Sequence, residues 1–577
     1  MLCELSRDAV ARLRDRFLEV GYTVEGVHAL LGPIAHSALH RNETTPGLRV
    51  TDRDTSPLAT MVRLWLLQAS LPWDQVAVAL PNLLEPLLEA EILHAYGRQV
   101  CALVDVRPYG VMGEPSTTGA PAIVGPTSPA GEAQAGDPGT ADLPSGPPAG
   151  DPPGVGGGSH DTGRDWWVVA DLTPGMDGAR PDVRPDFVLG VNNAATTLAQ
   201  LVVRRPVPRA LDLGTGSGIQ ALHLAEHASH IVATDVNPRA LAMARLTAGL
   251  AGIDVATSDE PGRLELRAGD LFQPFESTGE TFDLIVSNPP FVISPRGGLI
   301  YRDGGLGGDE LCRRIVTEAP RYLTEGGICQ ILANWLHIRG EDWRDRLQTW
   351  LARTGCDAWV VQREVSDPAE YVEVWLKDAG WHGAPGYQER YDEWLTWLEA
   401  QDVEAIGYGW ITLQRPGSGP AAGPPSAVEA ALGAVAGART PGPRRIRLEE
   451  WTGPVVQPLA GEVTRWLDTV DWLRRHDDEA LLETRLLVGT GIDQVQVGRP
   501  GASDPDYVML QQNLNMCRTA RVDTAEAGFV GACDGSMSVG QIIDALATLL
   551  EEEPTALRQR LLPRIRELLE EGYVVPA

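Results

Sequence analysis

From Val183 to about Pro416, short apolar segments alternate with segments of helical periodicity. This alternation predicts an α/β domain with a parallel sheet, because successive parallel strands need a crossover connection, which is usually a helix. Seven segments are apolar and rich in β-branched residues, as buried strands are; they are RALDLGTG, HIVATDV, LELRAGD, FDLIVSN, GGICQILAN, DAWVVQREV and GYGWITL. We therefore expect residues 183–416 to form one α/β domain around a seven-stranded sheet.

Residues 1–182 precede this domain, and the first half of them has helical periodicity. Two expected strands follow, at residues 99–110 and 166–174. Residues 113–164 lie between the strands and are rich in Gly, Pro, Ala and acidic side chains, so they cannot bury enough apolar surface to fold. We expect a helical, winged-helix-like domain whose hairpin tip has grown into a disordered loop. The alternative is that residues 1–182 only cap the α/β domain.

Residues 417–445 are a second segment rich in Gly, Pro and Ala, and we expect a linker there. Residues 446–577 then form a smaller accessory domain. Its last part has the order helix, helix, strand, which suggests a small α/β or winged-helix-like fold.

Charge and cysteine content narrow the classes of function. The 577 residues include 48 basic and 78 acidic side chains, for a formal net charge of −30, so a global basic surface for nucleic acid is excluded. The seven cysteines are dispersed and include no Cys-x-x-Cys pair, so we expect neither a disulfide framework nor a metal site. No apolar stretch approaches the length of about 20 residues that spans a bilayer, and no signal peptide is evident. We expect a cytoplasmic protein.

Glycines follow the first expected strand. The sequence LDLGTGSG, at residues 211–218, contains Gly214, Gly216 and Gly218. Glycines let the chain turn tightly and let a ligand approach backbone amides that a Cβ would block. A glycine loop alone is also found in dinucleotide-binding enzymes and in simple strand–helix turns.

Acidic residues follow the next two expected strands. Asp235 lies 23 residues after Asp212, and a carboxylate there can hold both hydroxyls of a ribose. Asp270 closes the third strand. Taken singly, Asp235 and Asp270 fit a helix cap or a turn equally well.

The fourth strand ends in Asn288-Pro289-Pro290-Phe291. Neither proline can donate a hydrogen bond to a sheet, so the chain leaves the sheet here with an amide and an aromatic ring held close together. A nicotinamide-dependent oxidoreductase has no need of this sequence, which disfavours that class.

Together, LDLGTGSG, Asp235, Asp270 and NPPF at the ends of successive strands resemble the Rossmann-like class I S-adenosylmethionine-dependent methyltransferases. The subset with an [Asn/Asp/Ser]-Pro-Pro-[aromatic] motif methylates planar nitrogens. The resemblance covers about Val183 to Leu413. It implies S-adenosylmethionine (SAM) as cofactor, no metal and no strong general base.

The resemblance also implies a role for each motif residue. The methionine portion of SAM would contact Asp212, Gly214, Thr215, Gly216 and Gly218; the remaining cofactor contacts would come from Asp235 with Asn237 at the ribose, from Asp270 and Leu271 at the adenine, and from Asn288 beside the methyl group. In the catalytic motif, the target NH2 would donate hydrogen bonds to Asn288 and to the carbonyl of Pro289, Pro290 would stiffen the chain, and Phe291 would stack on the target.

Two neighbouring segments extend the resemblance. Residues 184–203 and 301–327 are similar to segments of release-factor glutamine methyltransferases and of rRNA base methyltransferases. Asn192, Asn193 and Thr196 are therefore candidate site-lining residues. An N-capped helix that begins near Ala194 explains them equally well.

The tetrapeptide does not distinguish adenine, guanine and protein glutamine. Two winged-helix-like modules and arginine-containing segments favour a base of rRNA or DNA, and we expect a base. The net charge and the similarity of residues 301–327 favour instead a glutamine of a translation-related protein. The alternative from another class is a non-catalytic module that binds SAM or a peptide, which the presence of both the glycine loop and Asn288 disfavours.

Overall fold

The structure is a computed structural model, and it describes residues 5–110, 164–178, 184–258, 260–290, 292–295, 307–417, 444–500 and 505–577. The expected disordered loop, except for its last residue, lies outside the described residues. So does the expected linker, except at its two ends.

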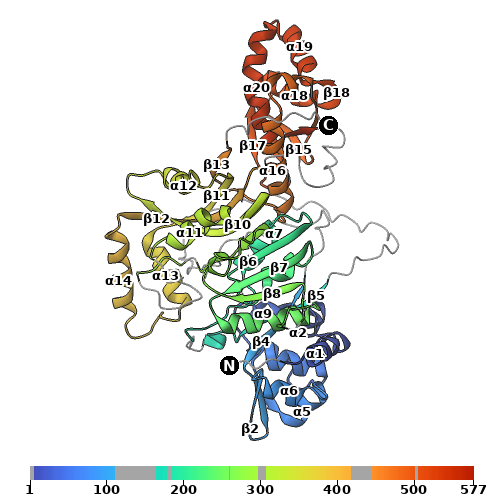
Figure 1. Ribbon diagram of the computed structural model, residues 1–577, viewed down its shortest axis with the longest axis vertical. Helices are drawn as coiled ribbons and strands as arrows, with labels where there is room; N and C mark the ends of the chain where they lie inside the picture. The colour runs from blue at the N-terminus through green and yellow to red at the C-terminus, as the bar shows by residue number, and fades with distance from the viewer. Residues whose placement is uncertain are drawn as a thin grey trace.

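A mixed eight-stranded sheet lies at the centre of the molecule (Figure 1). Its strand order is β13-β11-β12-β10-β9-β6-β7-β8. The strands are β6 (Val207–Leu213), β7 (Ala228–Asp235), β8 (Leu264–Ala268), β9 (Phe282–Ser287), β10 (Leu323–Ile338), β11 (Asp357–Ser366), β12 (Val403–Gln414) and β13 (Ile446–Glu450). Strand β12 is antiparallel to both of its neighbours, and all other pairs are parallel. The seven expected strands and the α/β class are confirmed.

Helices cover both faces of this sheet (Figure 1). The chain places α7 (Asn193–Leu201), α8 (Ile219–Leu224), α9 (Pro238–Leu250), α11 (Glu310–Glu318), α12 (Trp343–Leu351), α13 (Pro368–Asp378), α14 (Tyr387–Glu399) and α16 (Ala460–Arg475) around it. Along β6, Ala210 packs in the core that includes α7 and α16, whereas Leu211 packs in the core that includes α11 and α12. Alternate side chains of a strand point to opposite faces, so a continuous apolar strand supplies both cores.

The expected seven-stranded sheet needs one correction, because β13 adds an eighth strand. Ile446 pairs with Ala358 of β11, so residues assigned above to the accessory domain lie in the central sheet. A bidentate ion pair from Arg518 to Glu449 joins β13 to the C-terminal region. Trp466 of α16 is fully buried against Trp359 of β11. We therefore propose that the accessory domain begins after β13.

The rest of the C-terminal region contains two three-stranded sheets, with orders β18-β14-β19 and β15-β16-β17. Its elements are α17 (Asp478–Glu483), β14 (Arg485–Val488), β15 (Ile492–Val497), β16 (Tyr507–Gln512), β17 (Thr519–Val522), α18 (Thr524–Gly531), β18 (Asp534–Ser538), α19 (Val539–Leu550), α20 (Pro554–Glu571) and β19 (Val574–Pro576). The expected order helix, helix, strand is confirmed by α19, α20 and β19.

The N-terminal region is helical, as expected, but its hairpins differ from the expectation. Its elements are α1 (Arg7–Val20), α2 (Val24–Leu39), α3 (Thr45–Val50), α4 (Pro57–Met61), a π-helical turn (Val62–Leu66), β1 (Leu71–Pro72), α5 (Trp73–Ala79), α6 (Leu84–Glu89), β2 (Leu93–Tyr96), β3 (Gln99–Ala102), β4 (Val104–Gly110) and β5 (Asp165–Asp171). The expected strand 99–110 is interrupted at Leu103. Strand β3 pairs with β2 across a two-residue turn that Gly97 permits with a φ of 60°, and only β4 pairs with β5.

The N-terminal region also caps the α/β domain. Met243 and Leu250 of α9 belong to its hydrophobic core. Arg239 of α9 forms an ion pair with the buried Asp171 at the end of β5. From the sequence, residues 1–182 are expected to form either a helical domain with a hairpin or a cap on the α/β domain. The described part of this region contains helices and the β4–β5 hairpin, and it also packs on α9.

Candidate active site

Four strands bring the predicted motif residues to one edge of the sheet. Strands β6, β7, β8 and β9 are parallel, so their carboxyl ends share an edge. Leu213 of β6 lies opposite Thr234 of β7 and Ser287 of β9, and the hydroxyl of Ser287 donates to the Leu213 carbonyl at 2.7 Å. The glycine loop, Asp235 and Asn288 follow these three positions directly. In open α/β sheets, ligands bind outside such carboxyl ends, where the strand order reverses, as it does at β6.

The glycine loop turns through the left-handed region three times. Gly214, Gly216 and Gly218 have φ values of 76°, 55° and 87°. A Cβ on Gly214 or Gly216 would meet no atom within 4 Å, so the loop faces open space. A Cβ on Gly218 would lie 3.2 Å from the Ala244 backbone, so this glycine permits close packing against α9.

Asp212 lies under the loop and is 1% exposed. Its Oδ2 accepts hydrogen bonds from the Thr215 hydroxyl at 2.6 Å and from the Ala221 amide at 3.0 Å. Among the described residues, its buried Oδ1 has no hydrogen-bond partner. Burial raises the pKa of Asp212 to about 7. A buried oxygen without a partner is rare, and here it fits a cationic ligand group.

Asp235 holds the glycine loop from the neighbouring strand. Its two oxygens accept from the amides of Gly216 at 2.9 Å and Asn237 at 2.8 Å. Burial raises its pKa. Asn237 caps α9 through the Arg239 amide and donates to the Asp186 carbonyl, so both polar ends of its side chain hold the fold.

Asp270 and Leu271 follow β8 at the same edge. The Asp270 side chain is 63% exposed. Leu271 has a φ of 45°, a left-handed conformation that a residue with a Cβ rarely adopts. The next residue, Phe272, is buried and stacks on Tyr322 with ring centroids 4.6 Å apart, which holds this turn in place.

Asn288 begins where β9 ends. Its side-chain oxygen is buried and has no hydrogen-bond partner among the described residues. Pro289 is buried and Pro290 is half-buried. Phe291 lies outside the described residues. Two buried oxygens thus have no partner among the described residues, Oδ1 of Asp212 on β6 and the side-chain oxygen of Asn288 directly after the neighbouring strand β9.

The simpler explanation of the segment before β6 is confirmed. Asn192 caps α7 by accepting the Ala195 amide at 2.8 Å, and Asn193 begins the helix. The hydroxyl of Thr196 donates to carbonyls one turn back.

Comparison with known protein families agrees with this arrangement of strand ends. Residues 189–337 match the family described as methyltransferase small domain. The matched residues include every motif residue from Asp212 to Asn288. Residues 19–103 and 464–576 match two other families, each described as a domain of unknown function.

Curated relatives match only part of this chain. A release factor glutamine methyltransferase of Geobacter sulfurreducens is 31% identical over a 199-residue alignment, and the match covers 31% of this chain and 63% of that protein. A ribosomal protein uL3 glutamine methyltransferase of Bradyrhizobium diazoefficiens is 35% identical over 22% of this chain and 41% of its own length. Ribosomal RNA small subunit methyltransferase C of Idiomarina loihiensis is 30% identical over 25% of this chain and 36% of its own length. The chain thus spans less than two thirds of each of these relatives.

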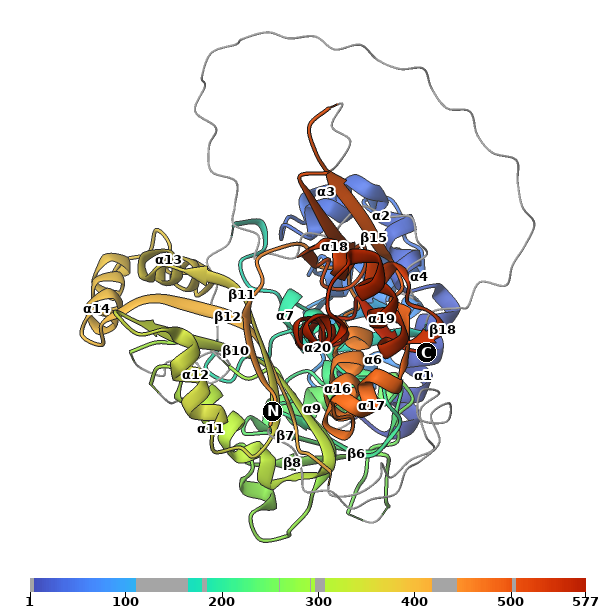
Figure 2. The same cartoon turned by 90° about the horizontal axis from the view of Figure 1, so that it is seen from above.

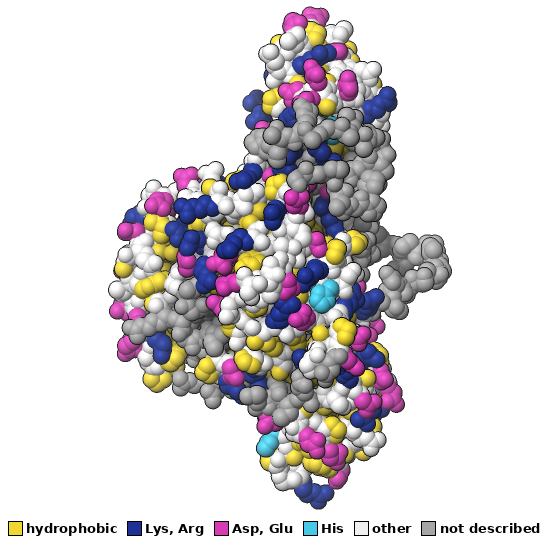
Figure 3. Space-filling view, in the orientation of Figure 1, with side chains coloured by type: hydrophobic (Ala, Val, Ile, Leu, Met, Phe, Trp, Pro, Cys, Tyr) yellow, Lys and Arg dark blue, Asp and Glu magenta, His cyan; other side chains and the backbone are white. Residues whose placement is uncertain are grey.

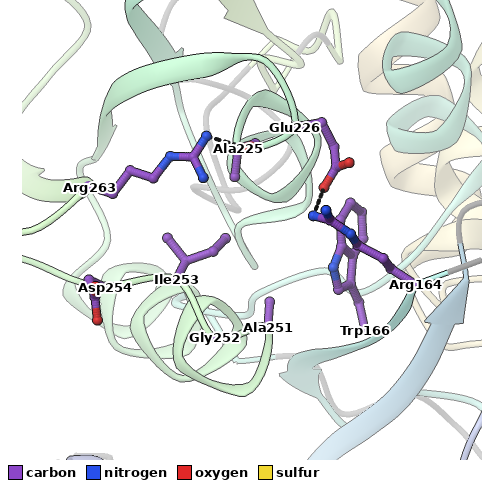
Figure 4. A pocket seen from close by; sticks show the side chains of 9 residues that line it. All are labelled: Arg164, Trp166, Ala225, Glu226, Ala251, Gly252, Ile253, Asp254 and Arg263. Carbon is purple, nitrogen blue, oxygen red and sulfur yellow. Dashed lines mark hydrogen bonds and ion pairs between the residues drawn. The ribbon is translucent and has the colours of Figure 1, made fainter.

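One cavity lies away from the methyltransferase motifs. It has a volume of about 210 Å³ and is lined by Arg164, Trp166, Ala225, Glu226, Ala251, Gly252, Ile253, Asp254 and Arg263 (Figure 4). Glu226 precedes β7 and Arg263 precedes β8, so the cavity lies at the amino ends of the strands, opposite Asn288. Its Arg164 and Glu226 pair with each other at 2.8 Å.

In the described part of the chain, no group of three or more His, Cys, Asp or Glu side chains is arranged to hold a metal ion. No described helix is long and apolar enough to cross a membrane.

Proposed function

We propose that this protein transfers a methyl group from SAM to a planar NH2 nitrogen. The observation that carries the proposal is the buried Asn288 oxygen, which has no partner among the described residues and follows the strand beside the glycine loop. A buried acceptor left unpaired in the fold is suited to an N–H group that arrives with the substrate.

The residues at this edge fit the cofactor. The free oxygen of Asp212 would accept from the amino group of SAM, and the open space over Gly214 and Gly216 would admit its methionine portion. We assign the ribose hydroxyls to Asp235 and the adenine to the turn at Asp270. SAM supplies an activated methyl group on a sulfonium.

The chemistry of the acceptor explains the Asn-Pro-Pro sequence. The lone pair of an amide or aromatic amine nitrogen is delocalised, so the nitrogen is a weak nucleophile. The side-chain oxygen of Asn288 and the carbonyl oxygen of Pro289 would accept hydrogen bonds from the two N–H groups of this nitrogen. These hydrogen bonds would favour a pyramidal nitrogen and stabilise the positive charge that develops on it. The prolines keep both oxygens aimed, and orientation supplies much of the remaining rate. Phe291 is the proposed stacking partner.

For the acceptor we propose a protein glutamine, and we keep a nucleic-acid base as the second candidate. Two of the three relatives above are named glutamine methyltransferases. Residues 367–399, which include α13 and α14, contain eight acidic side chains and only the basic residues Lys377 and Arg390. On the face shown in Figure 3, Lys and Arg side chains are interspersed with Asp and Glu side chains. Arginines of α11 and α12 form ion pairs with acidic side chains: Arg313 pairs with Glu310, and Arg346 pairs with Asp309. Such a surface disfavours a phosphate backbone. The rRNA methyltransferase relative favours the base.

Binding of SAM tests the cofactor assignment, and the affinity is expected to depend on pH. The folded-state pKa of Asp212, at about 7, lies far above that of a carboxyl in an unfolded chain, so the folded protein loses this proton as pH rises through about 7. The ionised form attracts the amino group of SAM. We expect calorimetric titration to show affinity about tenfold higher at pH 8 than at pH 6, in proportion to the ionised fraction.

Asp212→Asn is the control for this titration, because it replaces the titratable carboxyl with an uncharged amide of similar shape. The variant should bind SAM weakly and without the same pH dependence. If the wild-type protein binds no SAM at either pH, the proposed function is wrong. If its affinity is independent of pH, only the role of Asp212 is wrong.

A labelled-methyl assay tests the acceptor class. Purified protein and radiolabelled SAM are incubated with the protein, RNA and DNA fractions of a strain that lacks the gene. We expect label in the protein fraction that resists nuclease and appears as methylglutamine after hydrolysis. Label confined to RNA or DNA would select the base instead.

A further inference from the structure

We propose that Tyr371 of α13 and Trp394 of α14 are positioning residues, which hold the chain that follows Asn288 through its residue Ile293. This inference rests on the proposed function, because it concerns how the chain after Asn288 is held for methyl transfer. Nothing in the sequence motifs points to either residue.

The topology places the hairpin of α13 and α14 at the correct edge of the sheet. Strand β12 is antiparallel to both β10 and β11, so β11 runs parallel to β10 and to β9. The carboxyl end of β11, at Ser366, therefore lies at the same edge as Asn288. Helix α13 begins two residues later, and the two helices stand out from the body of the molecule beside the sheet (Figure 2).

A side chain from each of the two helices forms a hydrogen bond with the same residue, Ile293, in the chain that follows β9. Ile293 lies five residues after Asn288. Its amide donates to the hydroxyl of Tyr371 on α13 at 2.7 Å, and its carbonyl accepts from the indole N–H of Trp394 on α14 at 3.0 Å. One residue thus has both backbone groups fixed by two different helices.

The hydrogen bond between Ile293 and Tyr371 is buried, and the one between Ile293 and Trp394 is partly buried. Tyr371 is fully buried and Ile293 is 1% exposed. Their side chains share an apolar core with Leu336 of β10, Leu398 of α14 and Ile406 of β12. Burial raises the pKa of Tyr371 well above its ordinary value, so its hydroxyl stays neutral. In an apolar core, a lost partner is not replaced by water, and the backbone group left unpaired would shift.

By holding Ile293, Tyr371 and Trp394 would help to orient the oxygens of Asn288 and Pro289 that accept hydrogen bonds from the substrate. Asn288 and Pro289 must present two oxygens to one nitrogen, and both follow β9 directly. Tyr371 and Trp394 hold Ile293, five residues after Asn288. Small misplacements of reacting groups lower rates steeply, so these two residues should act on kcat rather than on cofactor affinity.

The test uses two variants that each remove one hydrogen bond and keep a ring, Tyr371→Phe and Trp394→Phe. We expect each to lower kcat about tenfold, with SAM affinity within about twofold of wild type. The double variant should lose less than the product of the single losses, because both bonds hold one residue. Rates are measured on whichever fraction accepts label from the wild-type protein.

Tyr391→Phe is the matched control. Tyr391 also lies on α14, but its hydroxyl donates to Glu373 within the hairpin, at 3.0 Å. Its kcat should stay within about twofold of wild type. The inference is overturned if Tyr371→Phe and Trp394→Phe keep wild-type kcat while their Tm falls, or if their SAM affinity falls as much as kcat. Failure of the wild-type protein to bind SAM would instead reject the proposed function.

Discussion

Replacing Asn288 with alanine is expected to lower kcat for methyl transfer by about 100- to 1,000-fold, the usual effect of removing one preorganised group that stabilises a developing charge. The Asn288 oxygen is buried and has no partner among the described residues, so its removal breaks no hydrogen bond seen in the fold. SAM affinity and Tm should therefore stay close to those of the wild-type protein. Single-turnover transfer of labelled methyl groups, with calorimetric SAM binding alongside, measures both quantities.

Asn288→Asp is the matched variant, because the motif pattern allows Asp at this position and a carboxylate still accepts N–H bonds. We expect it to retain activity within about tenfold of wild type, since the acceptor geometry is kept. Wild-type kcat in Asn288→Ala would contradict the proposed acceptor role. Loss of SAM binding in that variant would instead place Asn288 at the cofactor.

The second large effect is expected at the glycine loop. Gly216→Val should reduce SAM affinity by at least an order of magnitude, because the new side chain would project into the open space over the loop. The left-handed φ of 55° adds backbone strain of about 1–2 kcal/mol for a residue with a Cβ. Calorimetric titration and thermal unfolding separate the loss of binding from the loss of stability.

Gly279→Val is a close control. Gly279 has a φ of 67°, and a Cβ there would also meet no atom within 4 Å, but this residue lies in the loop before β9. Both variants should lower Tm by similar amounts, and only Gly216→Val should lose SAM. Equal SAM affinity in the two variants would show that the cofactor does not lie over this loop.

The strand ends could be predicted from the sequence because their signals are local. A buried strand followed by Gly214-Thr215-Gly216, by Asp235 or by two prolines has few alternatives, since turn chemistry and strand periodicity depend on neighbouring residues. Parallel strands then bring the ends together without further information. The seven strands predicted within residues 183–416 are confirmed for this reason.

The eighth strand had no such signal. Residues 446–450, IRLEE, are short and charged, and β13 forms because its backbone pairs with β11, about 90 residues earlier. Its acid, Glu449, is neutralised by Arg518, about 70 residues later. Edge-strand pairing depends on which surface the chain returns to, and neither periodicity nor composition encodes that.

In the N-terminal hairpins too, the sequence predicted that strands form but did not predict how they pair. The apolar run from Gln99 to Gly110 predicted one strand, and its break at Leu103 follows from two separate partners, β2 and β5. The tendency to form a strand depends on neighbouring residues. Which strand it pairs with depends instead on contacts between distant parts of the chain.

The sequence by itself determined the fold class and the residues at the strand ends, because both follow from side-chain type and short spacing. Only the tertiary structure decided which polar atoms remain without a partner and what holds the chain beyond Asn288. Oδ1 of Asp212 and the side-chain oxygen of Asn288 have no partner among the described residues, whereas the side-chain oxygens of Asn237 and Asn192 cap helices. Tyr371 and Trp394 reach Ile293 across 78 and 101 residues of sequence. Hydrogen-bond satisfaction depends on packing between distant segments, and packing is settled only when the whole core has formed.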